Sequence, residues 1–171
     1  MRLTTLLTPL ALITTAVADS KSIVAALTSA DTATAKLGTV VTSWKGDILG
    51  ALPIVTDSTA LLITVKKGTK TATDSAALDF YGTLDVATAT QHLTATVNST
   101  LSALIGAKHK FDKLLMSPVI FVTLELQKKA TADMSDAIIA KVPAQLQELA
   151  KDIVAPIGAS FEVALDAFHL I

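Results

Sequence analysis

Small and apolar side chains recur at alternating steps of four and three residues near the start of the chain, and this spacing limits the fold more than any other feature. The positions that share the spacing are Ile23, Leu27, Ala30, Thr34, Leu37, Val41, Trp44 and Ile48. Residues spaced in this way lie on one face of an α-helix, whereas a half-buried strand alternates with a period of two. The pattern therefore predicts a helix with one buried face.

Four further helices are predicted from the same periodicity. The second has its inward positions at Ile54, Ser58, Leu61 and Val65. The third buries Val86, Leu93, Val97, Leu101, Leu104 and Phe111. The fourth uses Val119, Val122, Leu126, Ala130, Ala137 and Ile138. The fifth uses Leu146, Leu149, Ile153, Ile157, Phe161, Ala164 and Phe168, with a kink expected at Pro156.

Glycine, proline and capping residues mark the boundaries between these helices. Gly50 and Pro53 separate the first two, and Lys66-Lys67-Gly68 is typical of a helix C-terminus, with residues 69–80 continuing after a kink. A turn at residues 81–83 lets Thr83 cap the third helix, while Ser117-Pro118 and Pro143 bound the fourth. Short connections favour antiparallel neighbours. We therefore predict an all-α fold, a single antiparallel bundle of about five helices in residues 19–171.

The first 18 residues have the pattern of a secretory signal peptide. Met1-Arg2 provides a positive start, residues 3–17 carry no charge, and Ala16-Val17-Ala18 is a small-x-small cleavage site. A genuine N-terminal helix of the mature fold is the alternative. No later run of apolar residues reaches the length of about 18 that a membrane span needs, so we expect a secreted, extracellular protein with no transmembrane anchor.

Composition excludes several classes of function. The chain has no cysteine, its only arginine is Arg2, and 14 basic residues nearly balance 15 acidic ones. A disulfide scaffold, a thiolate metal site and a strongly basic nucleic-acid module are therefore excluded or disfavoured.

No catalytic motif is present. His92, His109 and His169 form no His-x-x-x-His pair, and Gly158-Ala159-Ser160 lacks the second glycine of a nucleophile elbow. We expect no metal, no cofactor and no enzymatic activity.

The excess of apolar over charged residues suggests two functions beyond simple burial. Either the helices enclose a cavity for an apolar ligand, with hydroxyls such as Thr34 or Ser58 available to a head group, or they lay apolar faces on an external hydrophobic surface. The candidate cavity or surface-binding residues are Trp44, Ile48, Leu61, Val65, Phe80, Leu104, Phe111, Phe121, Leu126 and Phe161. Asn98, in the sequon Asn98-Ser99-Thr100, is a candidate glycosylation site.

The mature chain resembles the hydrophobic surface-binding protein A family of fungal secreted proteins, which includes cell-wall galactomannoproteins. The likeness lies in the order and spacing of short segments along residues 20–169. These are Ile23-Val24-Ala25-Ala26-Leu27, Trp44-Lys45-Gly46-Asp47, Ala51-Leu52-Pro53-Ile54, Lys67-Gly68-Thr69, Leu101 through Phe111 with Lys108-His109-Lys110, and Lys141-Val142-Pro143.

The resemblance implies a secreted helical bundle that adsorbs to hydrophobic surfaces, and for some members the recruitment of a secreted polyester hydrolase. Cell-wall relatives resemble fatty-acid binders with a cavity between the helices. Adsorption is the leading prediction, and carriage of a fatty acid or similar lipid is the alternative. Because the chain lacks a Ser/Thr-rich C-terminal stalk, we expect a released or loosely wall-associated glycoprotein.

Overall fold

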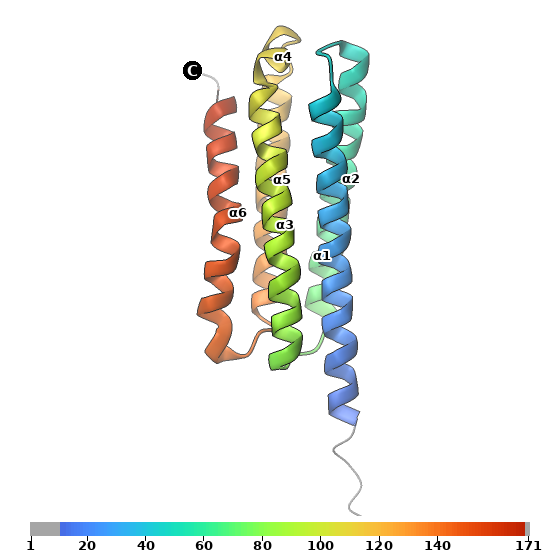
Figure 1. The fold of residues 1–171 in the computed structure, drawn as a ribbon, viewed down its shortest axis with the longest axis vertical. Helices are drawn as coiled ribbons and strands as arrows, with labels where there is room; N and C mark the ends of the chain where they lie inside the picture. Colours follow the sequence, from blue (N-terminus) through green and yellow to red (C-terminus); the bar gives the residue numbers. More distant parts are fainter. Residues whose placement is uncertain (1–10, 170–171) are drawn as a thin grey trace, which may run out of the picture.

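The structure, a computed structural model, describes the backbone of residues 11–169 and side chains from residue 19 onward. This part of the chain contains six α-helices and one 3₁₀ turn, which lie along a common long axis (Figure 1). In chain order they are α1 (Ala11–Ser43), α2 (Ile48–Asp74), α3 (Phe80–Gly106), the short α4 (Lys108–Lys113), α5 (Ser117–Ile139), η1 (Ala144–Leu146) and α6 (Gln147–Phe168). The all-helical prediction is confirmed.

The five long helices close into a ring. The main contacts run from α1 to α2, from α2 to α5, from α5 to α6, from α6 to α3, and from α3 back to α1. Each long helix therefore turns one face toward the centre of the ring, and the core of the molecule lies on its axis.

Consecutive long helices run in opposite directions, as predicted, but most pairs that are neighbours in the ring are not consecutive and run parallel (Figure 1). Thr100 Oγ1 donates to the Thr34 carbonyl at 3.1 Å and Lys110 Nζ donates to the Trp44 carbonyl at 2.6 Å, which sets α3 parallel to α1 at a constant offset. Only α1–α2 and α5–α6 are antiparallel neighbours. A short connection fixes where the next helix begins, but it does not fix which earlier helix that next helix packs against.

The same parallel register relates α2 and α5. Gln127 Nε2 donates to the Ser58 carbonyl at 3.3 Å, and Lys141 Nζ donates to the Thr73 carbonyl at 2.9 Å. The first pair lies near the middle of α5 and the second at the C-terminal ends of the two helices, so α2 and α5 stay side by side over this part of their length.

Two aspartates cap the N-termini of α2 and α3, and the sequence analysis had predicted other starting residues for these helices. Asp47 accepts a hydrogen bond from the Gly50 amide, and Asp79 accepts one from the Gly82 amide, each at 2.7 Å. Both are N-caps. The third helix therefore begins at Phe80, and Thr83 is not its cap. Gly68 does not end α2, which continues to Asp74.

The predicted inward faces of the first three helices are confirmed. On α1 every predicted position is buried except Ile48, which belongs to α2 and is exposed. On α5 the predicted face is partly wrong, because Val119, Val122 and Leu126 are exposed. The buried side chains of α5 are Ser117, Ile120, Leu124, Gln127, Ala130, Met134 and Ile138.

Aromatic side chains close one end of the ring. Trp44 and Phe111 lie 4.5 Å apart between ring centroids, and Phe168 packs edge-on against Phe111 at 5.9 Å. Lys110 Nζ lies 5.9 Å from the centre of the Trp44 ring. We call Trp44, Phe111 and Phe168 the aromatic end of the bundle.

Residues 1–10 of the predicted signal peptide lie outside the described residues, and residues 11–18 continue α1 as helix. The start of α1 projects past the rest of the bundle at the end opposite the aromatic end (Figure 1). The first buried side chains of α1 are Ser20 and Ile23. Removal of residues 1–18 stays a prediction.

One described helix, α2, is long and apolar enough to cross a membrane by length and composition alone. Its best 18-residue window has a mean hydropathy of 1.8, although polar residues interrupt the apolar run. In the structure α2 packs against α1 and α5 and buries Ile54, Leu61 and Val65. It is therefore a helix of the bundle.

Candidate functional site

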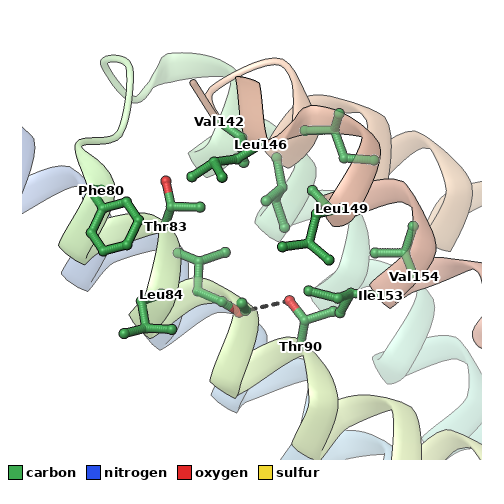
Figure 2. A pocket seen from close by; sticks show the side chains of 14 residues that line it. Phe80, Thr83, Leu84, Thr90, Val142, Leu146, Leu149, Ile153 and Val154 are labelled. Carbon is green, nitrogen blue, oxygen red and sulfur yellow. Dashed lines mark hydrogen bonds between the residues drawn. The ribbon is translucent and has the colours of Figure 1, made fainter. Parts of the chain in front are cut away.

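An apolar cavity of about 160 Å³ lies at the end of the bundle opposite the aromatic end. We call it the end chamber. Its walls come from the start of α3, the end of α5, η1 and the start of α6 (Figure 2). The lining residues are Phe80, Thr83, Leu84, Val86, Ala87, Thr90, Ile138, Ile139, Val142, Leu146, Leu149, Ala150, Ile153 and Val154.

The end chamber forms near the start of α6, where the side chains of the facing helix do not fill the space beside its inward face. Leu146, Leu149 and Ile153 belong to the face predicted to be buried, yet Leu149 is 58% exposed and the other two are half-buried. Opposite them, α3 presents Ala87 and Thr83, whose small side chains leave space unfilled. The sequence predicted these α6 residues to be buried in the core, and did not predict that they line a cavity. The pattern of one helix does not show how large the side chains of the facing helix are.

The end chamber is lined mainly by apolar atoms. Thr90 Oγ1 donates to the Val86 carbonyl at 2.8 Å, the bond drawn in Figure 2, and Thr83 Oγ1 donates to the Asp79 carbonyl at 2.8 Å. Both hydroxyl protons are therefore used within α3. No lining side chain is ionisable, so the chamber suits an uncharged apolar group.

Two smaller voids continue from the end chamber into the bundle. The first, of about 20 Å³, is the connecting cavity, which shares Thr90, Ile138 and Val154 with the end chamber. The second, of about 30 Å³, is the central cavity, which shares Leu93, Thr131 and Met134 with the connecting cavity. The shared walls place the three voids in a row along the interior.

The central cavity has polar groups in its wall, and they are hydrogen-bonded within the protein. Thr34 Oγ1 donates to the Ala30 carbonyl at 2.7 Å, and Thr100 Oγ1 donates to the Thr34 carbonyl. Gln127 is buried and its amide reaches the Ser58 carbonyl. The Thr34 hydroxyl, predicted to serve a head group, thus already donates its proton to its own helix.

The structure brings five of the ten predicted site residues to these cavities. Leu61, Val65, Leu104 and Phe161 line the central cavity, and Phe80 lines the end chamber. Phe80 is 61% exposed and contacts Tyr81 edge-on, so it stands at the rim of the chamber.

The other five predicted residues lie elsewhere. Trp44 and Phe111 belong to the aromatic end, and Phe121 packs against His169 with ring centroids 5.9 Å apart. Ile48 and Leu126 are exposed on the outer surface of α2 and α5. These two lie outside the cavities and remain candidates for contact with a surface.

Exposed apolar side chains gather on the neighbouring helices α2 and α5. The Ser58–Gln127 contact sets the two helices in register, so the first half of α2 lies level with the first half of α5. We define the outer apolar face by its exposed members, Ile48, Leu52, Val55, Val119, Val122 and Leu126. Large apolar patches on the surface of soluble proteins often mark interaction sites, so these residues are candidates for surface contact.

The predicted glycosylation site, Asn98, is half-buried on α3. Its side-chain carbonyl accepts a hydrogen bond of 2.6 Å from Ser160 Oγ on α6. Modification of Asn98 stays a prediction. Within residues 11–169, no three His, Cys, Asp or Glu side chains come together in a way that could hold a metal ion.

Comparison with solved structures shows the fold. Afmp4p in complex with palmitic acid superimposes with a TM-score of 0.85 at 21% identity, covering 88% of this chain and 99% of that one. Ligand binding domain 1 of the Penicillium marneffei MP1 protein, complexed with arachidonic acids, gives a TM-score of 0.85 at 18% identity, covering 89% and 99% of the two chains.

Curated relatives are fungal wall proteins. Cell wall mannoprotein 1 of Aspergillus fumigatus is 28% identical over 135 residues, which cover 79% of this chain and 47% of the relative. The protein of the same name from Aspergillus flavus is 28% identical over 111 residues, covering 65% and 41%. The chain thus spans less than half the length of these relatives.

The sequence profile of one family, described as hydrophobic surface binding protein A, matches residues 20–140. The matched region runs from the first buried residue of α1 to the end of α5 and contains most of the residues that line the three cavities. This chain belongs to the hydrophobic surface binding protein A family.

Proposed function

We propose that this protein is a non-enzymatic lipid binder of the cell exterior, which holds the acyl chain of a fatty acid or similar lipid in the row of cavities. The observation that carries the proposal is the end chamber, a preformed apolar cavity that opens at one end of a closed ring of helices. Solved structures with the same fold are complexes with palmitic and arachidonic acids, which supports a ligand of this class.

The size of the end chamber sets how much of a ligand it holds. An engineered cavity of about 150 Å³ binds benzene, so a chamber of about 160 Å³ takes only a small apolar group. A long acyl chain must therefore extend toward the connecting and central cavities, or leave part of its length at the rim beside Phe80.

Native mass spectrometry of the secreted protein, purified without detergent, tests the proposal. The expected spectrum shows the mass of residues 19–171 with one or two discrete lipid-sized adducts. A protein that carries no adduct, even after incubation with excess palmitic acid, would contradict lipid carriage.

A substitution within the chamber locates the bound chain. Ala150 lines the end chamber, so Ala150→Phe fills part of its volume and should weaken palmitic acid binding by about tenfold or more, the loss expected from about two buried methylenes. Ala155→Phe, at an exposed position of the same helix, is the matched control and should leave the dissociation constant unchanged. Equal affinity of both variants in calorimetry would place the ligand elsewhere. Leu61→Trp makes the same test of the central cavity.

The outer apolar face supports a second candidate function, adsorption to hydrophobic surfaces. A Val55→Ser, Val122→Ser double variant changes two exposed members of this face and no residue of the cavities. If this face adsorbs, the variant should bind less to polystyrene beads while its palmitic acid affinity stays the same. Val163→Ser, an exposed apolar position on α6, is the control. Unchanged adsorption of the double variant would exclude this face.

The family also bears on the location and partners of the protein. Its cell-wall relatives support a secreted protein that is loosely associated with the wall. Recruitment of a polyester hydrolase is a further prediction, which requires that the purified protein alone shows no ester turnover and that it increases the amount of hydrolase on a coated surface.

A further inference from the structure

We propose that Met134 is the gate between the connecting and central cavities, and that Gly68 holds the gate open by leaving room for its tip. The pair then determines how long an acyl chain the interior accepts. This inference rests on the proposed function, because it concerns the same row of cavities.

Met134 stands where the two inner voids meet. It lies on α5, is 4% exposed, and lines both the connecting and the central cavity. Leu93 and Thr131 share this position, but both side chains are branched. Methionine is unbranched and turns about three bonds, so it is the wall residue at this junction that changes shape most easily.

Gly68 provides the space that the tip of Met134 occupies. A Cβ atom at this buried position of α2 would lie 2.6 Å from Met134 Cε and 2.9 Å from Sδ. No real Cβ atom tolerates such distances, so any larger residue at position 68 displaces the methionine. Gly68 is helical, which leaves its contact with Met134 as the structural reason for glycine here.

The displaced tip needs free space to move into. The added Cβ would also be in contact with Ala26 Cβ of α1 at 3.6 Å, so it would fill the space between α2 and α1. The connecting and central cavities, which Met134 lines, are the free space beside this side chain. A side chain at position 68 therefore drives the methionine into the passage between the two cavities and closes it.

Closure matters for long ligands and not for short ones. The lining of the three cavities runs along α3 from Phe80 to Leu104, a distance of about 36 Å at 1.5 Å per residue. A short acyl chain does not reach Met134, whereas a long one that is buried along its length has to pass it. Because each buried methylene contributes about 0.8 kcal/mol, each one excluded weakens binding by about fourfold.

Isothermal titration calorimetry with octanoic and palmitic acids tests the gate. Gly68→Ala should weaken palmitic acid binding by about tenfold or more and leave octanoic acid binding unchanged. Adding Met134→Ala to the Gly68→Ala protein removes the displaced side chain and should restore the affinity for palmitic acid. Circular dichroism of each variant checks that the helices are intact.

Gly158→Ala is the matched control, because it also replaces a helical glycine and its new Cβ would meet nothing within 4 Å. It should alter neither affinity. If Gly68→Ala weakened both acids equally, or neither, or if Met134→Ala gave no rescue, the gate would be overturned while the lipid-binding function stood. A wild-type protein that bound neither acid would overturn both.

Discussion

At the scale of single residues, the interior of the bundle contains one buried acidic or basic side chain among those that the structure describes. Asp57 on α2 is 7% exposed, and Lys36 Nζ on α1 lies 2.7 Å from its Oδ1 atom. Lys36 itself is largely exposed, so its ammonium group stays mostly hydrated while it forms an ion pair with the buried Asp57. Removing one partner of such a pair costs more than forming the pair gains, because a buried charge is left without compensation.

Lys36→Met should therefore lower the free energy of unfolding by about 1–3 kcal/mol. The control is Lys70→Met, which removes an exposed ion pair with Asp74 and should change stability by less than about 0.5 kcal/mol. Urea denaturation of both variants measures the difference. Equal midpoints would mean that Asp57 does not depend on Lys36.

Residue identity also explains how much of the candidate site could be read from the sequence. Leu61, Val65, Leu104 and Phe161 were found because they lie on regular inward faces, and they line the central cavity. Of the residues that line the end chamber, only Phe80 was predicted as a site residue. Ala87 and Ala150 look like ordinary helix residues, and the space beside them exists only because α3 and α6 happen to face each other there.

At the scale of the elements, α5 shows the limit of periodicity. Val119, Val122 and Leu126 are apolar yet exposed, while Gln127 and Ser117 are buried, so hydrophobicity alone misplaced part of the buried face of α5. The inward faces predicted for α1, α2 and α3 are buried, although α2 also has Ile48, Leu52 and Val55 exposed on its outer side. The neighbours of each helix could not be predicted, since local spacing defines a buried face but not what covers it.

The junction of α4 and α5 depends on one carboxylate. Lys108 Nζ donates to Asp112 at 2.7 Å and Ser117 Oγ donates to it at 2.5 Å, and these bonds lower the pKa of Asp112 below its ordinary value of 3.8. Because the folded pKa is the lower one, the carboxylate stabilises the junction above pH 3.8, and this contribution is lost as the pH falls through the lowered pKa.

Lys108→Met should raise the pKa of Asp112 by more than Ser117→Ala does, because the bond from the ammonium is the larger cause. Carboxyl carbon shifts followed by NMR during an acid titration measure both variants. A larger rise in Ser117→Ala, or no rise in either, would show that the hydroxyl or another group controls the junction.

At the scale of the whole molecule, the two ends of the bundle differ in packing. Aromatic rings in contact with one another fill the aromatic end, and the end chamber leaves the opposite end hollow. Regions with fewer buried contacts open more often. The elements around the end chamber are therefore expected to be the least stable part of the ring.

Hydrogen exchange should report this difference. Amides in residues 147–154 of α6 should exchange faster than those in residues 161–168, although both lie in one helix, and palmitic acid should slow exchange in the first segment selectively. Mass-spectrometric exchange on the wild-type protein measures both effects. Uniform protection along α6 would mean that the hollow end is as stable as the aromatic end.

The closure of the ring also dictates an order of events during synthesis. Helix α1 lies between α2 and α3, so the first three long helices form a layer, and only the α5–α6 hairpin bridges its two edges. A chain made from its N-terminus exposes the apolar side of that layer until its last residues have been added. The α5–α6 hairpin thus closes the ring. A chain whose synthesis stops before α6 would leave the apolar inner face of the other helices uncovered.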